Sequence, residues 1–235
     1  MGPVRNEFWT EKERIRALYA KQAVDVRHSW FNSGFSIILQ ERERHVLHLL
    51  RKETFNNLSA TRILEVGCGA GAFLRDFVKW GARPENIFGV DLLDEHVAEA
   101  KALCPPGVSL LCRDASSLDF PDEGFDLVFQ STMFSSILDD CTRRGVASEM
   151  VRVVKRDGLI LWDDFHMNNP KNPDVRGVKR REINALFHGC GIKMRRITLA
   201  PPLARCIAPY SPMACEVLAK IPWLCTHYLA SIRKG

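Results

Sequence analysis

The chain is 235 residues long, 46% hydrophobic and 26% charged, a composition typical of one soluble globular unit with a sizeable core. These values argue against a disordered chain or a coiled coil. The formal net charge is +5, less than a dedicated nucleic-acid binder usually carries, so we expect no nucleic-acid partner. The surplus is uneven, because residues 171–235 hold 12 Lys and Arg against 3 Asp and Glu, whereas residues 1–170 hold 21 against 25. An anionic partner near the C-terminal elements is one explanation, and a solvated basic face is the other.

The cysteines and the N-terminus bear on the compartment. The eight cysteines form no Cys-x-x-Cys pair and no zinc-type cluster, so we expect buried, reduced thiols and no metal site. Residues 1–7 lack an apolar signal region, and no apolar run approaches the ~20 residues that span a bilayer. The sequence therefore predicts a cytoplasmic protein without a transmembrane segment.

Residues 1–57 predict a helical N-terminal extension. The pattern over residues 7–52 is helical and rich in charge, and it breaks near residues 32–34. Within it, Tyr19 and Trp30 are spaced, with Arg27 and His28, to present polar and aromatic groups to a cleft. Packing is the alternative role for these aromatic side chains.

Residues 58–235 predict an α/β domain, because short apolar runs alternate with amphipathic stretches. We expect strands at residues 62–66, 86–92, 108–113, 125–131 and 159–165, with helices at 72–80, 93–103 and 139–156 between them. This alternation is typical of a parallel sheet wrapped by helices. After a helix at 179–187, two final strands at 192–199 and 226–233 flank an apolar insertion at about 200–224 that contains a helix at 211–221.

A strand that runs into a glycine turn stands at residues 63–71, Ile-Leu-Glu-Val-Gly-Cys-Gly-Ala-Gly. Glycines at such a junction permit unusual torsions and let the main chain approach a ligand. The spacing Gly67-x-Gly69-x-x-Ala72 also fits the dinucleotide fingerprint. Asp91 ends the second predicted strand, where a carboxylate can accept both hydroxyls of a ribose. Nicotinamide and methionine-derived cofactors share that geometry.

Glu65, two residues before the first glycine, completes a string that resembles the class I S-adenosylmethionine-dependent methyltransferases of the small-molecule type. The resemblance covers roughly residues 60–165 and implies S-adenosylmethionine as the cofactor. It also implies a Rossmann-like, doubly wound sheet of seven strands with an antiparallel last strand, and an N-terminal extension that closes as a lid. The cofactor-binding residues that we expect are Glu65, Gly67, Cys68, Gly69, Gly71, Asp91, Leu92, Asp114, Ala115, Gln130 and Tyr19.

The candidate residues for chemistry follow the last two parallel strands. His166 is the best candidate for a general base, and Asp163 and Asp164 would orient it or bind the acceptor. Ser135-Ser136 stands where many small-molecule relatives carry Glu-His, so a base at that position does not transfer. We expect the acceptor to contact Arg176, which would hold an anionic group, together with Trp30 and Phe134.

The sequence therefore predicts methyl transfer to a small-molecule or saccharide acceptor, with oxygen favoured over nitrogen. Two alternatives use the same cofactor, an enzyme that cyclises it and a noncatalytic binding protein, and a nicotinamide-dependent oxidoreductase is the third. For the apolar insertion the sequence leaves four roles open: packing on the sheet edge, an acceptor-pocket wall, a dimer face, or peripheral contact with a membrane. A monomer and a homodimer are both compatible with the sequence.

Overall fold

The computed structural model describes residues 10–20, 29–169 and 172–235. In this part of the chain a single sheet contains seven strands in the order β3-β2-β1-β4-β5-β7-β6. The strands are β1 (Ile63–Val66), β2 (Ile87–Asp91), β3 (Ser109–Cys112), β4 (Phe125–Ser131), β5 (Val154–Phe165), β6 (Gly191–Leu199) and β7 (Cys225–Arg233). The first five are parallel, and β7 runs antiparallel to both of its neighbours. The predicted fold class is confirmed.

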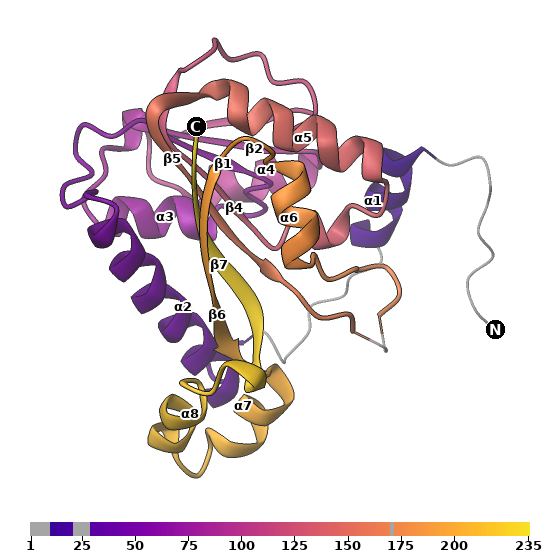
Figure 1. The fold of residues 1–235 in the computed structure, drawn as a ribbon. Helices are drawn as coiled ribbons and strands as arrows, with labels where there is room; N and C mark the ends of the chain where they lie inside the picture. Colours follow the sequence, from indigo (N-terminus) through magenta and orange to yellow (C-terminus); the bar gives the residue numbers. More distant parts are fainter. Residues whose placement is uncertain (1–9, 21–28, 170–171) are drawn as a thin grey trace.

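Helices cover both faces of this sheet (Figure 1). They are α1 (Glu11–Ala20), α2 (Ser33–Lys52), α3 (Ala72–Lys79), α4 (Asp94–Leu103), α5 (Asp140–Val153), α6 (Arg180–Leu186), α7 (Pro201–Ile207) and α8 (Pro212–Leu218). Because side chains alternate across a strand, Leu64 and Val66 of β1 pack with α5 and α6, whereas Ile63 packs with α2, α3 and α4. The sheet therefore lies between two apolar cores.

The observed element boundaries have local causes. Asn32 caps α2 by accepting a hydrogen bond from the Phe35 N–H at 3.1 Å, and Asp139 caps α5 through the Thr142 N–H. The insertion holds two helices, although the sequence predicted one. The additional helix, α7, begins at Pro201, and the first helical turn tolerates proline because its N–H groups need no intrahelical acceptor.

The C-terminal insertion, residues 200–224, packs on the first half of α2 and forms a third apolar cluster there. Ile38 of α2 meets Leu199, Ala204, Ala208 and Cys215 in this cluster. Gly34 lies so close to α7 that an added Cβ would come within 2.6 Å of the Arg205 Cα. Figure 1 shows α7 and α8, in yellow, beyond the lower end of the sheet beside the start of α2. Among the described helices, none combines the length and the apolar character needed to cross a bilayer.

Candidate functional site

A cavity of about 380 Å³ opens at the carboxyl ends of β1, β2, β3 and β4. This edge of an open α/β sheet is where ligands usually bind, because the loops that follow the parallel strands meet there. Three carboxylates from consecutive strands line the cavity: Glu65 from β1, Asp91 from β2 and Asp114 just after β3. The topology thus brings together acidic groups that are far apart in the sequence.

The innermost of the three carboxylates is Glu65. It is 2% exposed, and its Oε2 has no hydrogen-bond partner among the described residues. Burial raises the pKa of Glu65 well above its ordinary value, and the nearby carboxylates of Asp91 and Asp76 raise it further. An unpartnered buried carboxyl oxygen beside a cavity suits a cationic group in a ligand.

Asp91 organises the turn around the cavity. Its carboxylate accepts hydrogen bonds from the Gly69 N–H at 2.8 Å and the Leu93 N–H at 3.0 Å. His96 Nδ1 lies 3.2 Å from Oδ1 of the same carboxylate, and this hydrogen bond raises the pKa of His96. These three hydrogen bonds therefore hold the carboxylate in place at the end of β2.

The glycine turn between β1 and α3 exposes main-chain atoms at the cavity wall, because glycine has no side chain to cover them. Gly67 and Gly69 have φ of +73° and +51°, a region that glycine adopts far more readily than other residues. A Cβ added to Gly67 would come within 2.6 Å of Met133 Cγ, whereas one added to Gly69 would meet nothing within 4 Å. Because Gly69 lines the cavity, that open space is available to a ligand.

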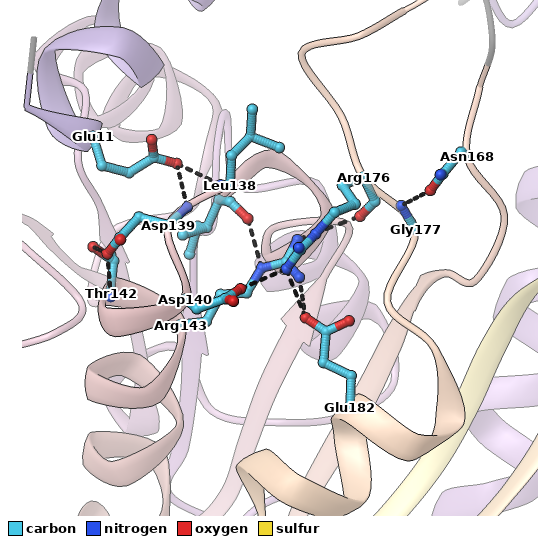
Figure 2. A network of polar contacts seen from close by, with 11 residues as sticks. Glu11, Leu138, Asp139, Asp140, Thr142, Arg143, Asn168, Arg176, Gly177 and Glu182 are labelled. Carbon is cyan, nitrogen blue, oxygen red and sulfur yellow. Dashed lines mark hydrogen bonds and ion pairs between the residues drawn. The ribbon is translucent and has the colours of Figure 1, made fainter. Parts of the chain in front are cut away.

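Helix α1 covers one side of the cavity, which Lys12, Ile15 and Tyr19 line. Lys12 forms an ion pair with Asp114, and the Tyr19 hydroxyl lies 3.1 Å from Ser136 Oγ. Figure 2 shows how the start of the helix is held, because the Glu11 carboxylate accepts hydrogen bonds from the main-chain N–H groups of Leu138 and Asp139. Segments more than 100 residues apart in the chain thus enclose the same space.

Comparison with known proteins identifies the family. A family described as "Methyltransferase domain" matches residues 63–158. The phosphatidylethanolamine N-methyltransferase of Cereibacter sphaeroides is 30% identical over 164 residues, which cover 67% of this chain and 76% of that protein. The chain belongs to the class I S-adenosylmethionine-dependent methyltransferases. The family's cofactor is S-adenosylmethionine.

Two further comparisons show how much of the chain and of its relatives the similarity covers. The chain is 32% identical over 114 residues to the 2-methyl-6-phytyl-1,4-hydroquinone methyltransferase of a Synechocystis strain, covering 47% of this chain and 34% of the relative. It spans from 30% to 54% of the length of several of its curated relatives. A crystal structure of a protein from Pyrococcus horikoshii superposes with a TM-score of 0.62 at 15% identity, covering 90% of this chain and 97% of the other, which supports the fold.

Toward α2 the cavity is lined by Arg42, which forms an ion pair with Asp163. Arg42 Nε donates to Asp163 Oδ2 at 2.9 Å, and Arg42 Nη2 donates to the same oxygen and to Ser131 Oγ. Asp163 is fully buried, and the Arg42 guanidinium lies over the ring of Phe73 at 5.6 Å. The buried carboxylate is therefore matched by a cation, which leaves this end of the cavity close to neutral.

The cavity brings together most of the residues that the sequence predicts at the cofactor: Tyr19, Glu65, Gly67, Cys68, Gly69, Asp91, Leu92, Asp114 and Ala115. Gly71 and Gln130 do not line it. Gly71 precedes α3, where an added Cβ would lie 2.7 Å from Cys104 Sγ. Gln130 is fully buried, and its side chain binds the main chain of Asp163 and Met133. Both residues thus lie behind the cavity wall.

The candidate base His166 and its neighbour Asp164 lie outside the cavity lining. His166 Nε2 is 3.0 Å from the Cys225 carbonyl oxygen, the ring packs on Tyr228, and burial lowers its pKa. Asp164 is fully buried, accepts hydrogen bonds from the Ser135 and Phe165 N–H groups, and has its pKa raised to about 7 by burial. A catalytic role for either residue, or for Asp163, stays a prediction.

The three predicted acceptor contacts also lie outside the cavity lining. Arg176 forms ion pairs with Asp140 and Glu182, in a network that the buried Arg143 completes (Figure 2). Phe134 is fully buried against Trp162. Trp30 is 66% exposed and meets the edge of Phe35, which does line the cavity. Arg27 and His28 fall outside the described residues.

Sequence reasoning missed several cavity residues, above all Phe35, Leu39 and Arg42 of α2. Their spacing of four and three residues puts them on one helical face, so periodicity offered a signal. No signal in the sequence indicated Lys12 or His96, because their contacts with Asp114 and Asp91 depend on the tertiary fold. Glu41, one residue before Arg42, is buried outside the cavity lining and accepts hydrogen bonds from the Thr198 and Leu199 N–H groups.

Proposed function

We propose that this chain transfers a methyl group from S-adenosylmethionine to a small-molecule acceptor. The observation that carries the proposal is one cavity lined by Glu65, Asp91 and Asp114 with the main chain of Gly69 open toward it. These residues fit the cofactor: the unpartnered Glu65 oxygen suits its ammonium group, Asp91 its ribose hydroxyls, and Asp114 its adenine amino group. When bound, the cofactor supplies a methyl group activated by a sulfonium.

The role we propose for the protein is alignment and exclusion of water. Methyl transfer from a sulfonium is an in-line displacement that depends on the orientation of the nucleophile. Ile15 and Tyr19 of α1 cover the cavity, and Met133 and Ile137 form apolar wall on the β4 side. Among the described residues that line the cavity, the one imidazole is that of His96, and it is bound to Asp91. We therefore propose positioning as the main contribution to catalysis.

We propose a neutral acceptor with an apolar body, and a hydroxyl as its nucleophile. The cations that line the cavity, Lys12, Arg42 and Arg113, are each paired with an aspartate, so the lining does not favour an anionic acceptor. The Arg42–Asp163 pair likewise leaves no uncompensated carboxylate there to hold an ammonium group, which favours oxygen over nitrogen.

A lipid is the acceptor class that we favour over a saccharide. Phe35, Leu39 and Phe73 give the α2 side of the cavity apolar walls, which match an alkyl or prenyl chain better than a polyhydroxylated ring. The names of two relatives specify lipid acceptors, a phytyl hydroquinone and phosphatidylethanolamine.

The test is to incubate the protein with methyl-labelled S-adenosylmethionine and a membrane lipid extract of the source cells. We expect S-adenosylhomocysteine to form and the label to enter the organic phase. Label confined to a saccharide fraction, or to transfer RNA added as a control, would contradict the lipid class. Formation of methylthioadenosine without a labelled acceptor would instead support cyclisation of the cofactor.

A further inference from the structure

Exposed apolar side chains gather at one end of the molecule. Of the C-terminal insertion, Tyr210, Met213, Val217 and Trp223 are between 56% and 90% exposed. Met213 and Val217 are four residues apart and so share one face of α8, whereas Cys215 on the opposite face is buried in the apolar cluster against α2. Helix α8 is therefore apolar on both sides, and only its inner side has a partner among the described residues.

The start of α2 extends this surface. Trp30 and Phe31 precede the helix and are 66% and 100% exposed. Two residues into the helix, Gly34 contacts α7 at Arg205, so the turn that carries Trp30 and Phe31 lies next to the insertion. We name these residues the apolar end: Trp30, Phe31, Tyr210, Met213, Val217, Ile221 and Trp223.

The apolar end is linked to the cavity through α2. Trp30 meets Phe35 edge-on with the ring centroids 6.4 Å apart, and Phe35 lines the cavity together with Leu39 and Arg42. These three residues follow one face of the helix from its first turn toward the glycine turn. A ligand at the apolar end is thus one aromatic contact away from the cavity wall.

We propose that the apolar end docks on an anionic lipid bilayer. Its tryptophans and tyrosine are the residue types that concentrate at membrane–water interfaces, where one side of the ring is apolar and the other wet. The charges of the insertion match an anionic surface. It carries two cations, Arg205 and Lys220, and one carboxylate, Glu216, whose charge is already paired with Arg44. A two-fold contact with a second copy would bring these cations close to their own equivalents.

The proposal deepens the proposed function, because docking brings a lipid acceptor to the cavity that we assign to methyl transfer. Its test is independent of catalysis. The protein is sedimented with phosphatidylcholine vesicles that contain or lack phosphatidylglycerol. We expect the protein to sediment with anionic vesicles and to remain mostly in solution with neutral ones.

Two matched double variants locate the docking surface. We expect Met213→Gln with Trp223→Gln to weaken vesicle binding by at least about tenfold, because it removes apolar area from the contact. Leu47→Gln with Leu103→Gln also replaces two exposed apolar residues, outside the apolar end, and should leave binding unchanged. Glutamine is a good helix former, which favours folding of both proteins. Lys220→Glu should weaken binding to anionic vesicles.

Three outcomes would overturn the docking proposal. The wild-type protein could stay in solution with anionic vesicles, or both double variants could sediment equally. A wild-type dimer that the Met213→Gln/Trp223→Gln variant converts to monomer, in analytical ultracentrifugation and with no vesicle binding, would assign the surface to a second copy. Calorimetric titration with S-adenosylmethionine separates the two proposals. A protein that binds the cofactor but not vesicles would contradict docking and leave the proposed function intact. A protein that binds vesicles but not the cofactor would contradict the proposed function and leave docking intact.

Discussion

Individual residues of the cofactor half follow from the sequence because each belongs to a strand and the turn after it. Asp91 was predicted from its place at a strand end, Glu65 and Asp114 from the family resemblance of the strings around them, and all three line the cavity. The sequence did not reveal the Arg42–Asp163 pair, because the two residues are 121 positions apart and meet only when α2 packs beside β5. It also assigned His166 to the site from its place after a strand, although the ring packs against Tyr228.

The carboxyl group of Glu65 should couple cofactor binding to proton release. Because its pKa is raised, the folded protein retains a proton there that a bound cation displaces. We expect affinity for S-adenosylmethionine to rise with pH through that pKa, and calorimetry in buffers of different ionisation enthalpy to detect the released proton. Glu65→Gln should bind without this release, and equal release from both proteins would contradict the assignment.

The Arg42–Asp163 pair should dominate local stability at the α2 end. Arg42→Met leaves a fully buried carboxylate without its cation and should lower the free energy of unfolding by about 3 kcal/mol. Adding Asp163→Leu should restore much of the loss. Arg44→Met breaks an exposed pair and should cost less than about 1 kcal/mol. Urea unfolding measures all three, and similar losses for the two single variants would argue against this role.

Elements were predictable where periodicity is strong and connections are short. Predicted and observed bounds agree within one or two residues for β1, β2, β3 and β4. Helix α7 was not predicted, because it is only seven residues long and begins with a proline pair. The position of α1 over the cavity rests on contacts with residues 114, 136 and 138, more than 100 positions away, which periodicity cannot predict.

Helix α1 should act as a cover whose attachment depends on Glu11. Burial alone would raise the pKa of Glu11, but hydrogen bonds from Arg14 and the Leu138 N–H outweigh it and lower the pKa. The attachment is therefore present near neutral pH and lost as the pH falls through that lowered value. We expect Glu11→Ala to weaken S-adenosylmethionine binding about tenfold and to speed amide exchange in α1.

Glu13 provides the control for this experiment, since it lies in the same helix and bonds only to Thr10 within the described contacts. Glu13→Ala should leave cofactor affinity within about twofold of the wild type. If Glu11→Ala left both affinity and exchange unchanged, the cover would not depend on this contact.

At the scale of the whole molecule, the uneven charge has a largely structural explanation. Arg176 and Arg233, from the basic last quarter, form ion pairs with Asp140 and Glu53, respectively, and Lys179 donates to the His166 carbonyl. These contacts tie the last quarter to the rest of the molecule. The anionic partner that the charge suggested is therefore better sought at the surface of the insertion than inside the cavity.

Global stability should depend on pH through Asp164. Its pKa of about 7, against an ordinary 3.8, means that between these values the folded state holds a proton that the unfolded chain has lost. The free energy of unfolding should therefore fall as the pH rises from about 4 to about 7, at up to about 1.4 kcal/mol per pH unit. Asp164→Asn should reduce this slope in urea unfolding, and parallel slopes would contradict the assignment.

The central claim is that the cavity at the ends of β1, β2 and β3 binds S-adenosylmethionine, and calorimetric titration of Asp91→Ala tests it most directly. We predict one site in the wild type and a loss of about 10- to 100-fold in affinity for the variant, because charge-assisted contacts to the ribose are removed. Asp94→Ala, in the first turn of α4 and outside the cavity lining, should bind like the wild type. Equal affinity of Asp91→Ala and the wild type would contradict the account.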